Sequence, residues 1–198
     1  MMAPRIGVIL AGGGARRLGG ADKGETLLAE KRLFDRVYER FAPQVDRVLI
    51  AGSHDYATAL TVIEDGATGP KGPAAGLFAA AMCLHANEPK AQGFVTAPVD
   101  APFLPHDLAQ RLREGDGSAI ARSAGRRHPT FAYWDANDLS AFFETSKAPA
   151  PALHEIAAGV GAREIDFGDD QAFFNVNTTE DLQAAEALIA AQGKRLTP

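Results

Sequence analysis

Apolar and polar positions alternate between strand-like and helix-like patterns over the first 65 residues. Continuous apolar runs predict three strands, over residues 5–11, 45–51 and 61–64. Leu33, Val37 and Phe41 lie at helical spacing, and Pro43 ends the helix that they predict. A further short helix is expected near residues 56–60. This order of strand, helix, strand, helix and strand predicts a parallel sheet with right-handed crossovers.

The rest of the chain continues this alternation and adds one antiparallel hairpin. Further strands are expected over residues 94–98, 118–122, 127–134 and 162–167. The turn from Ser123 to Arg126 joins the second and third of these strands as a hairpin. Further helices are expected from Pro73 onward, over residues 106–113, 138–144 and 152–158, and after Thr178. The pattern predicts a three-layer α/β/α fold of Rossmann type, with a mostly parallel sheet and an antiparallel insertion near residues 118–134.

The composition is that of a soluble globular protein with one domain. The chain has 198 residues, of which 46% are hydrophobic and 23% are charged, so residues 1–198 are expected to form a single domain with a full core. A net charge of −5 leaves no basic excess for a nucleic-acid backbone, so nucleic acid is not an expected partner. The single cysteine, Cys83, excludes a disulfide framework and a cysteine metal cluster. The apolar runs are too short to cross a membrane, and we expect a cytoplasmic monomer.

A glycine-rich loop directly after the first strand carries the clearest chemical signal. The consecutive glycines Gly12 to Gly14 remove side chains from this loop, so that its backbone can approach a ligand closely. Arg16, Arg17 and Lys23 add positive charge around it. Backbone N–H groups beside fixed cations suit an anionic triphosphate. A glycine turn with solvated arginines is the alternative, which the strand in front and the charges behind disfavour.

Two familiar phosphate-binding loops do not fit this spacing. A Walker loop needs a hydroxyl residue after its lysine, whereas Gly24 follows Lys23. A dinucleotide-binding loop needs glycine at its sixth position and opens directly into a helix. Arg17 stands at that position, and the next helix is expected only near Lys31. The sequence therefore predicts a different nucleotide site, in which the loop itself covers the phosphates.

Two further segments are placed to meet the same ligand. The glycines at the ends of residues 72–76 let a base or a ribose lie against the backbone, although a plain helix start is the alternative. Asp100 follows the expected strand over residues 94–98, and ligands of an open parallel sheet bind beyond the carboxyl ends of its strands. A carboxylate held there by neighbouring prolines suits Mg²⁺ beside a triphosphate, and the alternative is a surface aspartate in a proline turn.

These segments resemble the molybdenum cofactor guanylyltransferases, within the wider nucleotidyltransferase superfamily. The resemblance rests on five motifs: LAGGGARRLGGADKG at residues 10–24, GPAAG at 72–76, DAPFLP at 100–105, HPT at 128–130 and FNVNTTEDL at 174–182. Val99 stands where the family usually has cysteine, and Thr179 stands where it commonly has proline. A thiol is not a needed ligand for Mg²⁺, and a helix start tolerates threonine, so both roles are retained.

The resemblance implies a Mg²⁺-dependent enzyme that transfers GMP from GTP to the terminal phosphate of molybdopterin. The expected products are molybdopterin guanine dinucleotide and pyrophosphate. Other cofactor-biosynthesis proteins and acceptor molybdoenzymes are the expected protein partners. The alternatives are a cytidylyltransferase for the same pterin, a sugar-phosphate nucleotidyltransferase and a catalytically silent nucleotide-binding regulator. Residues 10–13 read LAGG where cytidyl relatives usually read LAAG, which favours guanine, and Lys23 with Asp100 argues against a silent protein.

The expected site residues divide into three groups. The catalytic group is Lys23, Arg17 and Asp100, and Asp100 is also the expected metal ligand. The nucleotide-binding group is Leu10, Ala11, Gly12, Gly13, Lys23, Asp65, Gly72, Gly76 and Asp100. The resemblance places three residues on the pterin side, namely His128, Asn175 and Asn177. We expect a GTP-binding half over residues 1–105 and a pterin-binding half over residues 106–198.

Overall fold

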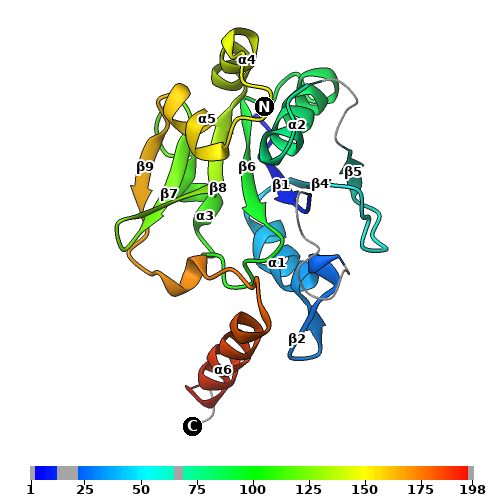
Figure 1. The fold of residues 1–198 in the computed structure, drawn as a ribbon, viewed down its shortest axis with the longest axis vertical. Coiled ribbons are helices and arrows are strands. Elements are labelled where there is room, and N and C mark those ends of the chain that lie inside the picture. The colour runs from blue at the N-terminus through cyan, green and yellow to red at the C-terminus, as the bar shows by residue number, and fades with distance from the viewer. Residues whose placement is uncertain (1–2, 13–21, 65–68, 196–198) are drawn as a thin grey trace.

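The computed structural model describes residues 3–12, 22–64 and 69–195, and a mixed sheet lies at its centre (Figure 1). Seven strands of the described chain form this sheet in the order β5-β4-β1-β6-β8-β7-β9. Their bounds are β1 Ile6–Leu10, β4 Arg47–Ala51, β5 Thr61–Ile63, β6 Gly93–Pro98, β7 Ala119–Ser123, β8 Arg126–Asp135 and β9 Arg163–Asp166. Only β8 runs against its neighbours, and the other neighbouring strands are parallel. The six parallel strands therefore end at one edge of the sheet, which we call the carboxyl edge.

Helices cover both faces of the sheet because each strand alternates its apolar side chains between two cores. Helices α1 (Leu33–Phe41) and α3 (Leu108–Leu112) pack on one face. The opposite face is covered by α2 (Pro73–Asn87), α4 (Ala136–Thr145) and α5 (Leu153–Gly159). In β1, Ile9 belongs to the first core, whereas Ile6 and Val8 belong to the second. This arrangement confirms the predicted three-layer α/β/α fold.

A last helix, α6 (Thr179–Arg195), projects from the carboxyl edge, away from the sheet (Figure 1). It packs against a small hairpin of β2 (Leu27–Leu28) and β3 (Lys31–Arg32). Ala185 of α6 shares a third apolar cluster with Leu28 of the hairpin and with Phe103, which follows β6. In the part of the chain that the structure describes, no helix has both the length and the hydropathy that a membrane span requires.

The helix expected near residues 56–60 is absent from the structure, so this prediction was wrong. The segment forms a turn, in which Tyr56 and Ala57 both have a φ of 52°. A left-handed backbone is unfavourable for an aromatic residue unless surrounding contacts hold it. Tyr56 is fully buried against Phe34 of α1, and that contact replaces the helix.

The antiparallel hairpin predicted near residues 118–134 is confirmed, because β7 and β8 pair in opposite directions. β7 lies parallel to β9 and in the same direction as β6, so β8 alone is reversed. The β2–β3 hairpin was not predicted, because strands of two residues are too short to show an apolar period. The other predicted strands and helices are confirmed, with ends that differ by a few residues.

Candidate active site

The predicted phosphate loop begins where the order of the strands changes direction. The chain runs from β1 to β4 on one side, and β6 lies beside β1 on the other. Ligands of open parallel sheets bind at such a switch point, outside the carboxyl ends of the strands. The backbone N–H of Val99 donates to the carbonyl oxygen of Leu10 at 3.1 Å. This bond places Ala11 and Gly12, at the start of the loop, beside the segment that carries Asp100.

Lys23, Asp100 and Asn177 meet in one cluster at this edge. The Lys23 Nζ donates to Asp100 Oδ2 at 2.6 Å and to Asn177 Oδ1 at 2.5 Å. Asp100 is 77 residues from Lys23 along the chain, and Asn177 is 154 residues away. The side chains of the ion pair are only 11% and 13% exposed. An ammonium group has three N–H donors, so this geometry leaves one donor of Lys23 for a ligand oxygen.

The start of α6 holds the third member of this cluster in place. The N–H of Val176 donates to the carbonyl oxygen of Asp100 at 2.8 Å. The Asp181 carboxylate accepts the N–H groups of Asn177 and Thr178, each at 2.9 Å, and the Thr178 hydroxyl accepts the Asp181 N–H in return. The donor on Asn177, followed by that on Thr178, keeps the pKa of Asp181 below its usual value. This reciprocal cap fixes the backbone that carries Asn177.

The donor set around Asp100 fits a magnesium ion that is shared with substrate phosphates. Asp100 Oδ1 is buried and has no hydrogen-bond partner within the described residues, while Oδ2 faces Lys23. Mg²⁺ favours carboxylate oxygens and keeps water or phosphate oxygens as its other ligands. The described residues contain no cluster of three His, Cys, Asp or Glu side chains that would bind a metal by themselves. Among the described residues of this cluster, Asp100 would supply the carboxylate oxygen for such an ion, and a bound phosphate would supply further oxygens.

Known proteins share both the sequence and the fold of this chain. The family model of the MobA-like NTP transferase domain matches residues 7–166. The chain belongs to this MobA-like family. A protein from Cereibacter sphaeroides named molybdenum cofactor guanylyltransferase is 40% identical over 193 residues, which cover 93% of this chain and 96% of the relative. The family resemblance read from the sequence is thus confirmed.

Solved structures agree with the MobA-like fold. Molybdopterin-guanine dinucleotide biosynthesis protein A from Archaeoglobus fulgidus superposes with a TM-score of 0.68 at 22% identity, covering 94% of this chain and 99% of its own. A Mycobacterium tuberculosis protein in complex with manganese has a TM-score of 0.64 at 16% identity, covering 94% and 100% of the two chains. At these identities the likeness concerns the fold alone.

Of the other residues predicted to bind the nucleotide, the structure describes some and leaves others outside its described ranges. Gly72 precedes α2 with a φ of 70°, and a Cβ built on it meets no atom within 4 Å. Backbone conformation, and not crowding, is therefore the reason for glycine at this position. Gly76 lies half-buried in the first turns of α2. Three predicted residues lie outside the described ranges, namely Gly13, Arg17 and Asp65.

His128 lies at the carboxyl edge in an aromatic setting of its own. Its ring stacks on Phe173 at 4.7 Å with an angle of 14°, and Nε2 lies 2.7 Å from the Ser123 hydroxyl. The Ser123 hydroxyl donates to Asp170 at 2.8 Å, so its single proton is used and His128 Nε2 is the donor to it. Burial, and next the charge of Arg126, lowers the pKa of His128. Asn175, which the sequence also predicted on the pterin side, has a buried Oδ1 without a partner among the described residues.

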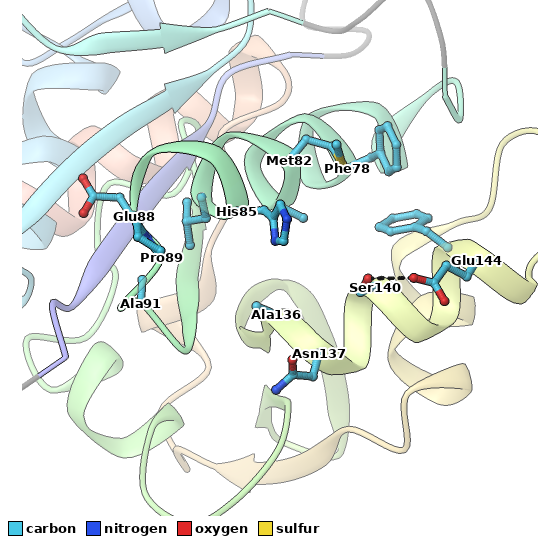
Figure 2. Close-up of a pocket in the computed structure, with 13 residues that line it drawn as sticks. Phe78, Met82, His85, Glu88, Pro89, Ala91, Ala136, Asn137, Ser140 and Glu144 are labelled. Carbon is cyan, nitrogen blue, oxygen red and sulfur yellow. Dashed lines mark hydrogen bonds between the residues drawn. The ribbon is translucent and has the colours of Figure 1, made fainter.

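A separate pocket of about 630 Å³ lies between α2 and α4, and none of the predicted site residues lines it. Figure 2 shows Phe78 and His85 of α2 on one side of this pocket, with Ala136 and Ser140 of α4 on the other. Its walls are mainly apolar and hold no counterpart of the buried ion pair. This cavity is therefore separate from the Lys23 cluster at the carboxyl edge.

Sequence reasoning missed two residues beside Lys23. Asp22 caps the turn that begins with Lys23, and the Tyr56 hydroxyl donates to the same carboxylate. An aspartate directly before a helical turn is a known capping signal, so Asp22 was open to prediction. Tyr56 carries no local signal, because its contact spans 34 residues and lies in the segment wrongly predicted as a helix.

Proposed function

We propose that this chain transfers GMP from GTP to the terminal phosphate of molybdopterin, forming molybdopterin guanine dinucleotide and pyrophosphate. Full-length similarity to the molybdenum cofactor guanylyltransferase of Cereibacter sphaeroides supports this reaction. The observation that carries it is the buried contact of Lys23 with Asp100 and Asn177 at the switch point of the sheet. This contact gathers an ammonium donor and a carboxylate where a triphosphate reaches the strand ends.

The chemistry needs positioning and charge neutralisation more than a base. The terminal phosphate of the pterin is already an anionic nucleophile, and its attack on the α-phosphorus is opposed by the charge of the triphosphate. Lys23 and Arg17, with the backbone N–H groups after Ala11, offset that charge and the charge that develops on pyrophosphate. Mg²⁺ on Asp100 supplies further neutralisation when it is bound. The hydrogen bond to Asn177 keeps the ammonium of Lys23 turned toward the phosphates.

The other predicted contacts complete the proposal. Leu10, Ala11, Gly12, Gly13, Asp65, Gly72 and Gly76 contribute to the nucleotide side, with a GTP-binding half over residues 1–105. His128 and Asn175 serve the pterin side in the half over residues 106–198, and Asn177 lies between the two sides. The likeness in fold to a manganese-bound protein accords with a divalent metal requirement, for which Mg²⁺ is the ion we propose. The working protein is a cytoplasmic monomer that passes its product to acceptor molybdoenzymes.

One incubation series tests this function against its alternatives. The protein is mixed with Mg²⁺, molybdopterin and each of the four nucleoside triphosphates in turn, and the dinucleotide is identified by mass. We expect the guanine dinucleotide to form fastest. Equal rates from GTP and CTP would assign the chain to the cytidylyltransferases. Transfer to a sugar phosphate but not to molybdopterin would favour the sugar nucleotide alternative, and no transfer at all would favour a silent regulator.

A further inference from the structure

The turn that carries Lys23 is capped by a carboxylate that also reaches a distant tyrosine. Lys23 opens a single 3-10 turn, η1 (Lys23–Glu25), and Asp22 is its N-cap. Asp22 Oδ1 accepts the N–H of Gly24 at 2.8 Å and the hydroxyl of Tyr56 at 2.6 Å. One oxygen atom therefore joins the lysine turn to the connection between β4 and β5.

Tyr56 is itself fixed by the protein core. Its side chain is fully buried, and its ring stacks on Phe34 of α1 with centroids 4.1 Å apart and an angle of 9°. The Arg32 guanidinium donates to the Tyr56 carbonyl oxygen at 3.1 Å, which helps to hold the left-handed backbone. Burial, followed by the hydrogen bond with Asp22, raises the pKa of Tyr56, so its hydroxyl stays a donor across the working pH range.

The lysine turn lies directly against this tyrosine. A Cβ placed on Gly24 would lie 2.4 Å from Cε1 of Tyr56 and 2.6 Å from its hydroxyl oxygen. Only glycine allows the ring this close to the backbone of the turn. Tyr56 and Asp22 thus hold the backbone of Lys23 from one side, while Asp100 and Asn177 hold its ammonium from the other.

We propose that Tyr56 and Asp22 are positioning residues that act on nucleotidyl transfer through Lys23. The inference rests on the proposed function, in which the Lys23 ammonium meets the phosphates of GTP. A turn that loses its bond to Tyr56 can shift along the sheet edge. A Lys23 ammonium displaced by a fraction of an ångström then stabilises the negative charge that develops on pyrophosphate less well. In this proposal, neither Tyr56 nor Asp22 has to contact a substrate.

The first test removes single atoms and measures transfer from GTP. Tyr56→Phe keeps the stacked ring and removes the bond to Asp22, and we expect kcat to fall about tenfold, the loss typical of one hydrogen bond to a charged group. Tyr38→Phe is the matched control, because Tyr38 also stacks on Phe34, at 6.0 Å, but has no bond to the lysine turn. Asp22→Asn keeps an acceptor oxygen and should retain most of the rate, whereas Asp22→Ala should lose at least as much as Tyr56→Phe. We expect the melting temperature of Tyr56→Phe to stay close to that of the wild type.

A second test separates positioning from a general structural role. Tyr56→Phe is combined with Lys23→Ala, and both kcat and the dissociation constant of GTP are measured in each background. If Tyr56 acts through Lys23, its loss has no further effect once the ammonium is gone. Equal losses in both backgrounds, or a wild-type rate in Tyr56→Phe, would overturn the inference. Failure of the unmodified protein to bind GTP or to transfer from it would instead overturn the proposed function, and the inference with it.

Discussion

Two clusters at the carboxyl edge are built in opposite ways. The Lys23 cluster is charged, nearly buried and assembled from three segments that lie far apart in the sequence. The His128 cluster is aromatic and half-exposed, and a serine and an aspartate orient a ring with a lowered pKa. Phosphates need fixed charge in a place that excludes water, whereas a planar ring needs a flat surface with a few polar atoms. The contrast supports a division of labour in which the first cluster serves the triphosphate and the second the pterin.

The strongest challenge to this division is Asp100→Asn. Asparagine keeps an oxygen for Lys23, so we expect the fold to persist while metal-dependent transfer falls on the order of 100- to 1,000-fold. Steady-state rates at saturating Mg²⁺ measure the effect, and thermal melting checks the fold. A rate near that of the wild type would show that the charged cluster is not the centre of the chemistry.

Lys23→Ala should have the next largest effect, and it should act on stability as well as on binding. The change leaves the Asp100 carboxylate buried without its partner, which typically costs about 3 kcal/mol. Lys31→Ala is the control, because the pair of Lys31 with Glu39 is exposed and contributes less than about 1 kcal/mol. Urea unfolding of both variants tests this difference, and titration with GTP should show weaker binding for Lys23→Ala only. Equal stability losses would mean that the Lys23–Asp100 pair behaves as a surface pair.

His128→Ala should raise the KM for molybdopterin, the other substrate. A ring stacked on the pterin would contribute about 1 kcal/mol to binding, so loss of the His128 ring should raise the KM for molybdopterin severalfold. The KM for GTP should stay the same, because the described contacts of His128 do not include the Lys23 cluster. His85→Ala, in the pocket between α2 and α4, is the control and should change neither value. A rise in the KM for GTP would show that the His128 cluster and the Lys23 cluster belong to one site.

The smallest expected effect is a pH dependence of stability that arises from His128. Its folded pKa is lowered, so the unfolded chain takes up a proton first as the pH falls below about 6.5. The free energy of unfolding should therefore fall through this window, and the contribution should level off below the folded pKa. Urea unfolding at about pH 7.5 and pH 5 should show a larger loss for the wild type than for His128→Phe. Parallel losses would mean that the histidine titrates as it does in the unfolded chain.

The sequence alone determined most of the architecture and the first half of the site. Continuous apolar runs marked β1, β4 and β6, because strands covered on both faces carry mostly apolar side chains. The glycine loop after β1 and Asp100 after β6 follow from position alone, since the ends of parallel strands share one edge. The reciprocal cap of Thr178 with Asp181 was also readable, because it is formed by residues three apart.

Only the tertiary structure decided which side chains meet. The bond from Lys23 to Asn177 joins residues 154 positions apart, and no periodicity or spacing encodes such a contact. Tyr56 shows the same limit more sharply, because its segment was predicted as a short helix, whereas packing against Phe34 and the bond to Asp22 hold a left-handed turn. Local sequence sets which backbone conformations are inexpensive, whereas burial and long-range hydrogen bonds select among them. The positions of Gly12 and Asp100 at the strand ends were therefore predictable, and the contacts that hold Lys23 in place were decided by the fold.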